Sequence, residues 1–285
     1  MTARAGGYRR VALAAALLAA LVACKDSRAV NDANGRIADV LATPGSDHAS
    51  AVARDSAVLT LARAAGGADG LQYTVSAQAT SGFIVGKVSG GEPRDTSISP
   101  THDLSVCRPF TQSLVPSRDG GVGNSVVWLV GVATGPRDDA PRRVRVMLDR
   151  CRLEPRVQRV AAGGTVMITS RDAMMTRLQF VDVGGASASR GTVHLNDAGQ
   201  VVPTSDAAKV AGLVQIRDDL HPWIRAYLVV TPHPFVAVTA ADGAFRFDNV
   251  APGSYTLVMW HERFGTKQQR VRVDAHVETR VELQF

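Results

Sequence analysis

The sequence predicts an all-β protein made of two β-sandwiches that follow an export signal and a flexible tether. From residue 82 onward, short apolar and β-branched runs recur at roughly 8–12-residue spacing with turn residues between them. No long segment of helical periodicity interrupts these runs, which disfavours a parallel α/β fold. A hydrophobic content of 45% with 26 Gly and 13 Pro excludes a disordered chain, a collagen and a disulfide-dense miniprotein.

The N-terminus has the pattern of an export signal. A short basic segment precedes the unbroken apolar run 11–23. This run is shorter than the roughly 20 residues of a membrane-spanning helix, and its length is typical of a signal peptide. The basic residues of the segment are Arg4, Arg9 and Arg10. We therefore expect residues 1–23 to be removed on export.

The apolar run ends in Leu21-Val22-Ala23-Cys24, which resembles the bacterial lipobox. In that family the cysteine is acylated, and the acyl chains anchor the mature N-terminus in the membrane. The alternative is an ordinary secretory signal with a cysteine at its end by chance. Because Lys25 rather than Asp follows the cysteine, the resemblance implies an outer membrane lipoprotein with its body in the periplasm or at the cell surface.

The two other cysteines and the net charge are interpreted in the light of export. In an oxidising compartment, Cys107 and Cys151 are expected to form a disulfide. Removal of residues 1–23, which contain three arginines and no acid, lowers the formal net charge from +6 to +3. The basic balance is therefore weak support for an acidic partner.

The mature chain divides into a tether and two β regions. Residues 24–80 are rich in Ala, Asp, Ser, Arg and Gly, and we expect a largely disordered tether with one candidate helix at 50–65. We expect a first β domain over 81–232 and a second over 233–285. Strand patterning occurs at 83–88, 125–132, 144–148, 157–160, 165–168, 177–183, 213–216, 226–230, 235–239, 245–247, 255–260, 270–273 and 279–285.

The C-terminal strands resemble the carboxypeptidase regulatory-like domain, a prealbumin-like β-sandwich that also occurs among carbohydrate-binding-like folds. The family has a T-x-x-x-G-x-F strand and a P-x-G-x-Y-x-L strand. Thr239–Phe245 matches the first, and Pro252–Leu257 contains the Pro, Gly, Tyr and Leu of the second, with Gly253 directly after Pro252. Asp242-Gly243 is expected to form a hairpin turn. The resemblance covers roughly 50 residues and implies a fold and a class of ligand, carbohydrate.

The region from Cys151 to about Val230 is similar to cupredoxin-like domains, which are Greek-key β-barrels or sandwiches. A type 1 copper site in that family needs two imidazoles, a thiolate and a weak axial thioether. The family pattern places a His four residues after an N-x-D strand end and a later C-x-x-H-x-x-M cluster. The corresponding positions here are Thr176, Asp218, His221 and Ile224. One ligand of four is retained, so we expect no metal and no other cofactor; a copper-binding electron-transfer protein is the alternative.

The number of C-terminal strands indicates that the two β regions share elements. A prealbumin-like sandwich normally has about seven strands, and residues 233–285 provide about five. The strands near 83–88 and 126–132 precede the cupredoxin-like region. We therefore hypothesise that they complete the C-terminal sandwich, with the cupredoxin-like part inserted between.

Several aromatic and histidine residues are candidates for a binding surface at the junction of the two regions. Stacking on a sugar or on a protein partner would use such side chains; the alternative is that they pack in the core or between domains. These residues are His221, Trp223, His233, Phe235, Trp260, His261 and Glu262.

No catalytic motif is present, and we expect no enzymatic activity. The chain lacks G-x-S-x-G, H-E-x-x-H, a P-loop and a dinucleotide fingerprint. The pairs Asp138-Asp139 and Asp218-Asp219 are expected to be solvated turns, and the alternating arginines are typical of the solvent face of a sheet. The sequence thus predicts a non-catalytic envelope lipoprotein that acts as a binding or scaffold module, with carbohydrate or an envelope protein as its partner and not nucleic acid. The alternative is an accessory module of a polysaccharide-degrading system.

Overall fold

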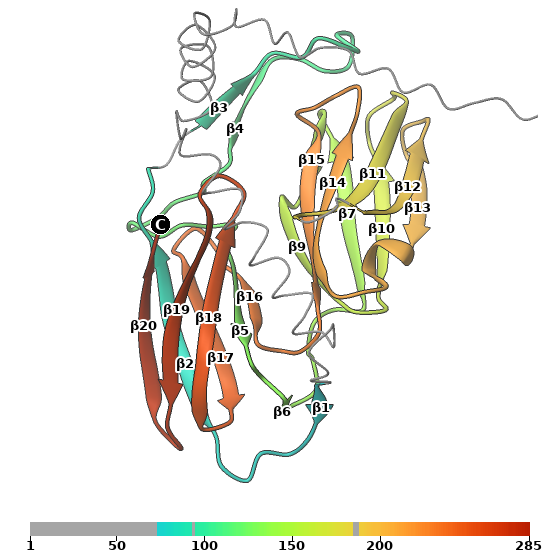
Figure 1. Ribbon diagram of the computed structural model, residues 1–285. Helices are drawn as coiled ribbons and strands as arrows, with labels where there is room; N and C mark the ends of the chain where they lie inside the picture. Colours follow the sequence, from blue (N-terminus) through green and yellow to red (C-terminus); the bar gives the residue numbers. More distant parts are fainter. Residues whose placement is uncertain (1–72, 93–94, 185–187) are drawn as a thin grey trace, which may run out of the picture. The chain divides into compact units, whose positions relative to one another are not determined.

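The computed structural model describes residues 73–92, 95–184 and 188–285, and these belong to one compact unit within Ser46–Phe285 (Figure 1). The all-β fold class is confirmed, because the strands form two β-sandwiches and the helical content of the described residues is a single 3-10 turn, η1 (Asp206–Ala208). The predictions for the signal peptide 1–23, for Cys24 and for the helix 50–65 lie outside the described residues. No helix in the described ranges is long and apolar enough to cross a membrane.

The first sandwich, here called the inserted sandwich, lies within residues 143–231. A sheet with the order β13-β10-β7-β8 packs against a sheet with the order β12-β11-β14-β15-β9. The alternating buried side chains of both sheets, such as Ile168 and Phe180, form its core. Its strands are β7 (Arg143–Asp149), β8 (Arg152–Glu154), β9 (Val157–Ala161), β10 (Thr165–Ser170), β11 (Thr176–Asp182), β12 (Ser189–Leu195), β13 (Val201–Thr204), β14 (Gly212–Asp218) and β15 (Arg225–Thr231).

The second sandwich, here called the composite sandwich, combines strands from both ends of the described chain. Its sheets have the orders β16-β5-β18-β19 and β17-β2-β20. Ile84, Leu129 and Phe247 are among the buried residues between them. The strands are β2 (Gly82–Ser89), β5 (Val126–Val130), β16 (Val236–Val238), β17 (Ala244–Val250), β18 (Gly253–His261), β19 (Gly265–Val273) and β20 (Glu278–Gln284).

The two early strands lie in the composite sandwich. Strand β2 pairs with β17 and with β20, and β5 pairs with β16 and with β18 (Figure 1). This is the arrangement that the insertion hypothesis requires. The first β domain expected over 81–232 therefore does not begin at residue 81, because 82–89 and 126–130 complete the sheets of the C-terminal strands.

The expected hairpin at Asp242-Gly243 is wrong. Strand β16 before it pairs with β5, and β17 after it pairs with β2 in the opposite sheet, so the turn connects two sheets. Gly243 has a φ of 73° and its N–H donates to Ala240 O. The Asp-Gly pair provides the left-handed turn residue that was expected, but sequence alone does not show which strands it joins.

Two small sheets lie outside the sandwiches. The first pairs β1 (Thr74–Val75) with β6 (Thr134–Gly135), so the end of the expected tether 24–80 is part of the folded structure. The second pairs β3 (Asp95–Ile98) with β4 (Phe110–Ser113). The segment 99–109 between β3 and β4 reaches the inserted sandwich, where the disulfide Cys107–Cys151 holds it.

The two sandwiches pack through a third apolar cluster. Trp128 and Trp260 from the composite sandwich pack with Tyr227 and Val229 from the inserted sandwich. The rings of Tyr227 and Trp260 meet edge to face at 4.9 Å. One face of the β16-β5-β18-β19 sheet is thus covered by the inserted sandwich along part of its length.

Candidate functional site

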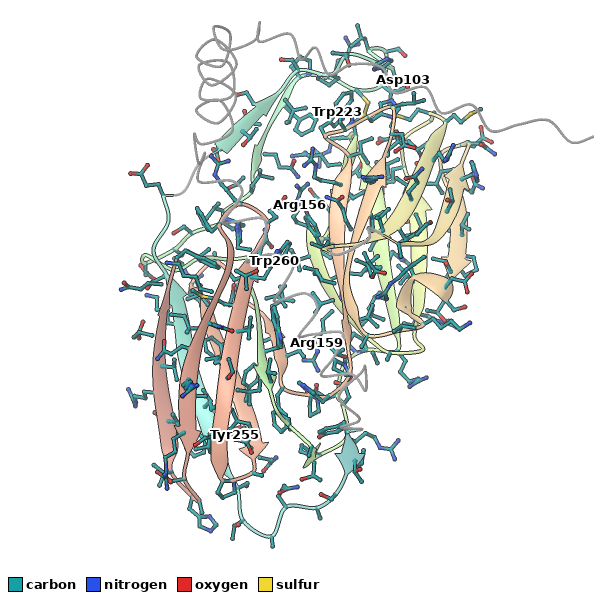
Figure 2. The ribbon with its side chains drawn as sticks, viewed as in Figure 1. Asp103, Arg156, Arg159, Trp223, Tyr255 and Trp260 are labelled. Carbon is teal, nitrogen blue, oxygen red and sulfur yellow. A yellow bond between two sulfur atoms is a disulfide. The ribbon has the colours of Figure 1, made fainter. Side chains whose placement is uncertain are left out.

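An open cleft of about 530 Å³ lies on the composite sandwich and is here called the basic cleft. Ser254, Thr256, Arg270 and Arg272 provide its polar side chains; Figure 2 labels Tyr255, which also lines it. The complete lining is Val130, Gly131, Ser254, Tyr255, Thr256, Arg270, Val271 and Arg272. The lining contains guanidinium and hydroxyl groups and lacks Asp, Glu, His and Cys.

The strand register explains why these polar side chains share one face. Thr256 pairs with Arg270 and with Val130, and Ser254 pairs with Arg272. Directly paired residues point to the same side of a sheet, and alternate residues share a side. Further along β18 the same side carries Trp260, which the inserted sandwich covers. The basic cleft therefore occupies the part of this sheet face that the inserted sandwich leaves exposed.

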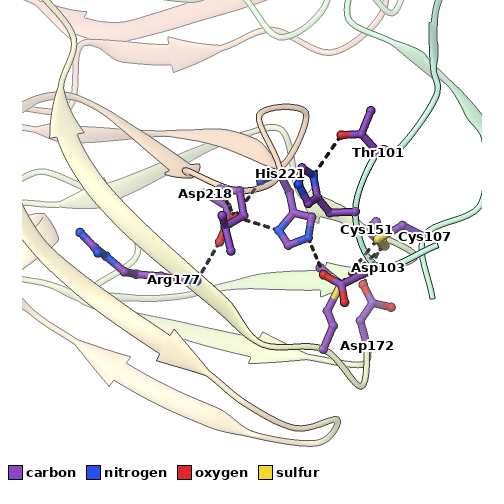
Figure 3. A network of polar contacts seen from close by, with 11 residues as sticks. Thr101, Asp103, Cys107, Cys151, Asp172, Arg177, Asp218 and His221 are labelled. Carbon is purple, nitrogen blue, oxygen red and sulfur yellow. Dashed lines mark hydrogen bonds and ion pairs between the residues drawn. A yellow bond between two sulfur atoms is a disulfide. The ribbon is translucent and has the colours of Figure 1, made fainter. Parts of the chain in front are cut away.

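A second polar site lies at the end of the inserted sandwich and centres on His221 (Figure 3). His221 is fully buried, and each of its ring nitrogens lies 2.8 Å from a carboxylate oxygen: Nδ1 from Asp218 Oδ1 and Nε2 from Asp103 Oδ2. Asp103 belongs to the segment 99–109. The imidazole thus connects this segment to the end of β14.

Both carboxylate oxygens of Asp218 accept hydrogen bonds at this site. Its Oδ1 accepts the backbone N–H groups of Leu220 and His221, both at 2.9 Å, in addition to the His221 ring. Its Oδ2 accepts the N–H of Arg177 at 2.7 Å. The carboxylate therefore fixes the loop after β14 to the start of β11, and the expectation that Asp218-Asp219 forms a solvated turn is wrong for Asp218, which is 3% exposed.

The four positions of the copper-ligand pattern gather at this end of the inserted sandwich, but their chemistry does not fit copper. Thr176 and Ile224 are buried and provide a hydroxyl and an alkyl group. The carboxylate of Asp218 and both nitrogens of His221 are engaged in the hydrogen bonds above. In the described ranges, no group of three or more His, Cys, Asp or Glu side chains is arranged to hold a metal ion.

The predicted disulfide Cys107–Cys151 is confirmed, and it lies beside the His221 site. Met174 Sδ lies 3.5 Å from Cys107 Sγ and 3.8 Å from Cys151 Sγ. Asp172 accepts the backbone N–H groups of Arg150 and Cys151 at 2.8 and 2.7 Å. The disulfide and the Asp103–His221 contact therefore hold the segment 99–109 at two points.

The predicted aromatic and histidine surface is not a surface, and its members do not gather in one place. Trp223 lies in the core of the inserted sandwich, with its ring centroid 5.4 Å from that of His221. Trp260 lies in the third apolar cluster, between the two sandwiches (Figure 2). Phe235 belongs to the core of the composite sandwich, beside His233. The aromatic and histidine members are all buried, so the alternative interpretation as core and inter-domain packing describes them.

His261 and Glu262 also have separate partners. His261 stacks on Phe264 with ring centroids 4.9 Å apart, and its Nδ1 accepts the N–H of Arg263. Burial lowers the pKa of the His261 imidazole. Glu262 instead pairs with Arg156 across the junction.

A buried polar cluster that includes Tyr73, Asp138 and His233 lies where the chain passes, twice, from one sandwich to the other. His233 follows β15, is fully buried, and neither of its ring nitrogens has a hydrogen-bond partner in the described part of the chain. Burial lowers its pKa to about 4. Tyr73 packs 5.6 Å away, and burial, with the nearby Asp138 carboxylate, raises its pKa to about 12.

Asp138 belongs to the same cluster and is not the solvated turn residue that was expected. Its side chain is 17% exposed, contacts Arg159 at 3.0 Å and accepts the hydroxyl of Thr231 at 2.5 Å. Asp139 is 77% exposed, which agrees with the expectation. The local sequence does not distinguish Asp138 from Asp139, because the packing of the segment between the two sandwiches decides which side chain is buried.

Sequence reasoning missed the basic cleft and the role of Asp103. Arg270 and Arg272 were assigned to the solvent face of a sheet, which is correct, but the pairing with Ser254 and Thr256 depends on the β18–β19 register. The alternation of apolar and polar residues on both sides of the turn at Gly265 is the one sequence signal that could have aligned β18 with β19. Nothing near Asp103 in the sequence indicates its contact with His221, 118 residues away.

Comparison with protein families gives a match to polysaccharide lyase family 4, domain II, over residues 208–281. The matched segment is about a quarter of the chain; it begins within the inserted sandwich before β14 and includes β18 and β19, with the basic cleft's residues 254–256 and 270–272. No curated protein matches this chain.

Cupredoxins are among the solved structures similar to this chain. A reduced amicyanin mutant is 23% identical, with a TM-score of 0.27 over 31% of this chain and 81% of that chain. The purple cupredoxin of Nitrosopumilus maritimus is 18% identical, with a TM-score of 0.27 over 31% of this chain and 99% of that chain. Amicyanin from Paracoccus versutus is 20% identical, with a TM-score of 0.26 over 32% and 81%. At these values the similarity says nothing about copper in this chain.

Proposed function

We propose that this protein is a non-catalytic polysaccharide-binding module of the bacterial cell envelope and that the basic cleft is its binding site. The observation that carries this proposal is the position of the cleft: it lies on the exposed part of a sheet face, and all of its lining except Val130 and Gly131 belongs to the segment that matches a polysaccharide lyase domain. Guanidinium and hydroxyl groups on a fixed sheet can form several hydrogen bonds to a sugar chain.

The lining of the cleft supports binding without chemistry. General acid–base cleavage of a polysaccharide needs titratable groups placed against the sugar, and the lining lacks carboxylates and imidazoles. Tyr255 is its one titratable group apart from the arginines; its hydroxyl donates to Ala251 O at 2.8 Å, and burial raises its pKa. Tyr255 is therefore poorly suited to act as a base.

The binding proposal is tested with the full chain purified in detergent on a glycan array, followed by calorimetry with every polysaccharide that binds. We expect binding to be weakened in the variant Thr256→Leu, which removes a hydroxyl and fills part of the cleft without adding charge, and retained in Thr192→Leu, a matched change at an exposed position of β12 in the inserted sandwich. Absence of binding to all glycans would overturn the proposal in favour of a protein scaffold. Turnover of a bound polysaccharide would overturn the non-catalytic part.

The envelope location is part of the same proposal and rests on the lipobox-like sequence ending at Cys24. We propose that acyl chains on Cys24 anchor the protein in the outer membrane, with the two sandwiches in the periplasm or at the cell surface. Radiolabelled palmitate should enter the wild-type protein and not a Cys24→Ala variant. Equal labelling of both proteins, or of neither, would refute the anchor.

A further inference from the structure

We propose that the ligand of the basic cleft is an anionic polysaccharide, whose carboxylate or sulfate groups are bound by Arg270 and Arg272. This inference rests on the proposed function and names the class of sugar that the site accepts. It is carried by the charges of β19, by the ion-pair partners of its arginines and by their spacing on the sheet.

Strand β19 is a cationic edge strand. Its sequence GTKQQRVRV contains Lys267, Arg270 and Arg272 and no acidic residue. It forms the edge of the sheet with the order β16-β5-β18-β19, so its far side has no neighbouring strand in that sheet. Charged residues are a common protection of edge strands against pairing, but this function does not require that the charges share one sign.

The two arginines of the cleft are available to a ligand. Among the described residues, Arg270 has no carboxylate within ion-pair distance, whereas most arginines elsewhere on the composite sandwich are paired, such as Arg280 with Glu278. Arg272 contacts Asp274 at 3.1 Å, but both side chains are more than half exposed. Exposed pairs of this kind contribute little, so a ligand anion can replace Asp274.

The spacing of these side chains suits a polymer with repeated acidic groups. Arg270 and Arg272 are two residues apart on one side of the strand, a separation of roughly 6–7 Å in an antiparallel sheet. Each guanidinium can form two parallel hydrogen bonds to a carboxylate or a sulfate. Thr256 and Ser254, opposite them on β18, offer hydroxyl groups to the sugar ring, which an acidic peptide would not need.

The experiment measures binding of the full chain to four polymers at low and physiological salt: alginate, which carries carboxylates; dextran sulfate, which carries sulfates; neutral dextran; and poly-aspartate, an acidic polymer without sugar. We expect binding to alginate or dextran sulfate that weakens at higher salt, because screening reduces attraction between exposed charges. We expect much weaker binding to dextran and to poly-aspartate.

Charge-neutralising variants identify the site. Arg270→Gln and Arg272→Gln should each raise the dissociation constant for the anionic polysaccharide roughly tenfold, as expected for the loss of a charge-assisted hydrogen bond. Arg280→Gln, which removes an exposed arginine from β20 in the opposite sheet, is the matched control and should change the constant less than about twofold. Circular dichroism verifies that each variant is folded.

The outcomes separate this inference from the proposed function. Binding confined to neutral glycans, lost in Thr256→Leu, would overturn the anionic inference and leave the polysaccharide-binding proposal in place. Equal binding of poly-aspartate and alginate, or equal losses in the Arg270→Gln and Arg280→Gln variants, would show general charge attraction and overturn the inference. No binding to any glycan would overturn both.

Discussion

Arg156 and Glu262 form a two-point ion pair across the junction of the two sandwiches. Arg156 Nε lies 2.7 Å from Oε1 of Glu262 and Nη2 lies 2.5 Å from Oε2, and the side chains are 9% and 6% exposed. Arg156 also donates to Arg225 O and lies over the Tyr227 ring. These hydrogen bonds fix the loop after β18 against the start of β9.

Removal of one member of this pair should be costly. Glu262→Ala leaves the Arg156 guanidinium buried without its counter-charge, and we expect the free energy of unfolding to fall by about 3–5 kcal/mol. Urea denaturation measures the change. Asp248→Ala is the control, because it breaks the exposed Arg246–Asp248 pair, and it should cost less than about 1 kcal/mol. A similar small loss for both variants would contradict the importance of the junction pair.

Burial of His233 predicts a loss of stability in acid. Its folded-state pKa of about 4 lies below the unfolded value of 6.5, so the unfolded chain binds the proton more readily. The stabilising contribution is therefore complete above about pH 6.5 and is lost progressively as the pH falls toward 4, by about 3 kcal/mol in total.

A substitution isolates the contribution of His233 from that of other groups. His233→Phe should flatten the difference in unfolding free energy between pH 7.5 and pH 5, measured by urea denaturation. His194→Gln, an exposed change on β12, should leave the difference as in the wild type. His261, whose pKa burial also lowers, acts in the same direction and remains in both variants. An unchanged pH dependence in His233→Phe would show that His233 is not the responsible group.

Local patterns predicted the fold class well because strand periodicity and turn residues are short-range properties. The runs at 144–148, 165–168 and 255–260 all lie in strands. The hairpin prediction at Asp242-Gly243 failed because the destination of a turn depends on which strands are free to pair, and β2 and β5 occupy those positions from far away in the chain.

The candidate sites were predicted less well, because burial and long-range pairing decide them. Trp260 and His221 were chosen for their side-chain chemistry, yet both are buried by residues that are distant in the sequence. The disulfide could be predicted because two cysteines of an exported chain have few alternatives. No sequence signal indicates the roles of Asp103 and Ser254, because each role depends on contacts with another segment that only the folded structure shows.

The network at His221 predicts unequal costs for its two carboxylates. Asp218 accepts three backbone N–H groups and the imidazole, so Asp218→Ala should lower the unfolding free energy by about 3 kcal/mol. Asp103 is 43% exposed and contacts one ring nitrogen, so Asp103→Ala should cost about 1 kcal/mol or less. Faster amide exchange at Arg177 in the first variant only would verify the assignment, whereas equal costs would contradict it.

The disulfide predicts a specific pattern of loosening on reduction. Cys107 and Cys151 are 44 residues apart, and the closed loop should contribute about 3–4 kcal/mol on the chain-entropy estimate. A Cys107→Ser, Cys151→Ser variant should lose about this much in urea denaturation. Because the Asp103–His221 contact remains, amide exchange should accelerate within 99–109 while β14 and β15 stay protected. Addition of Asp103→Ala to this variant should then increase exchange at 101–107 further; no additional increase would show that the Asp103–His221 contact does not hold the segment.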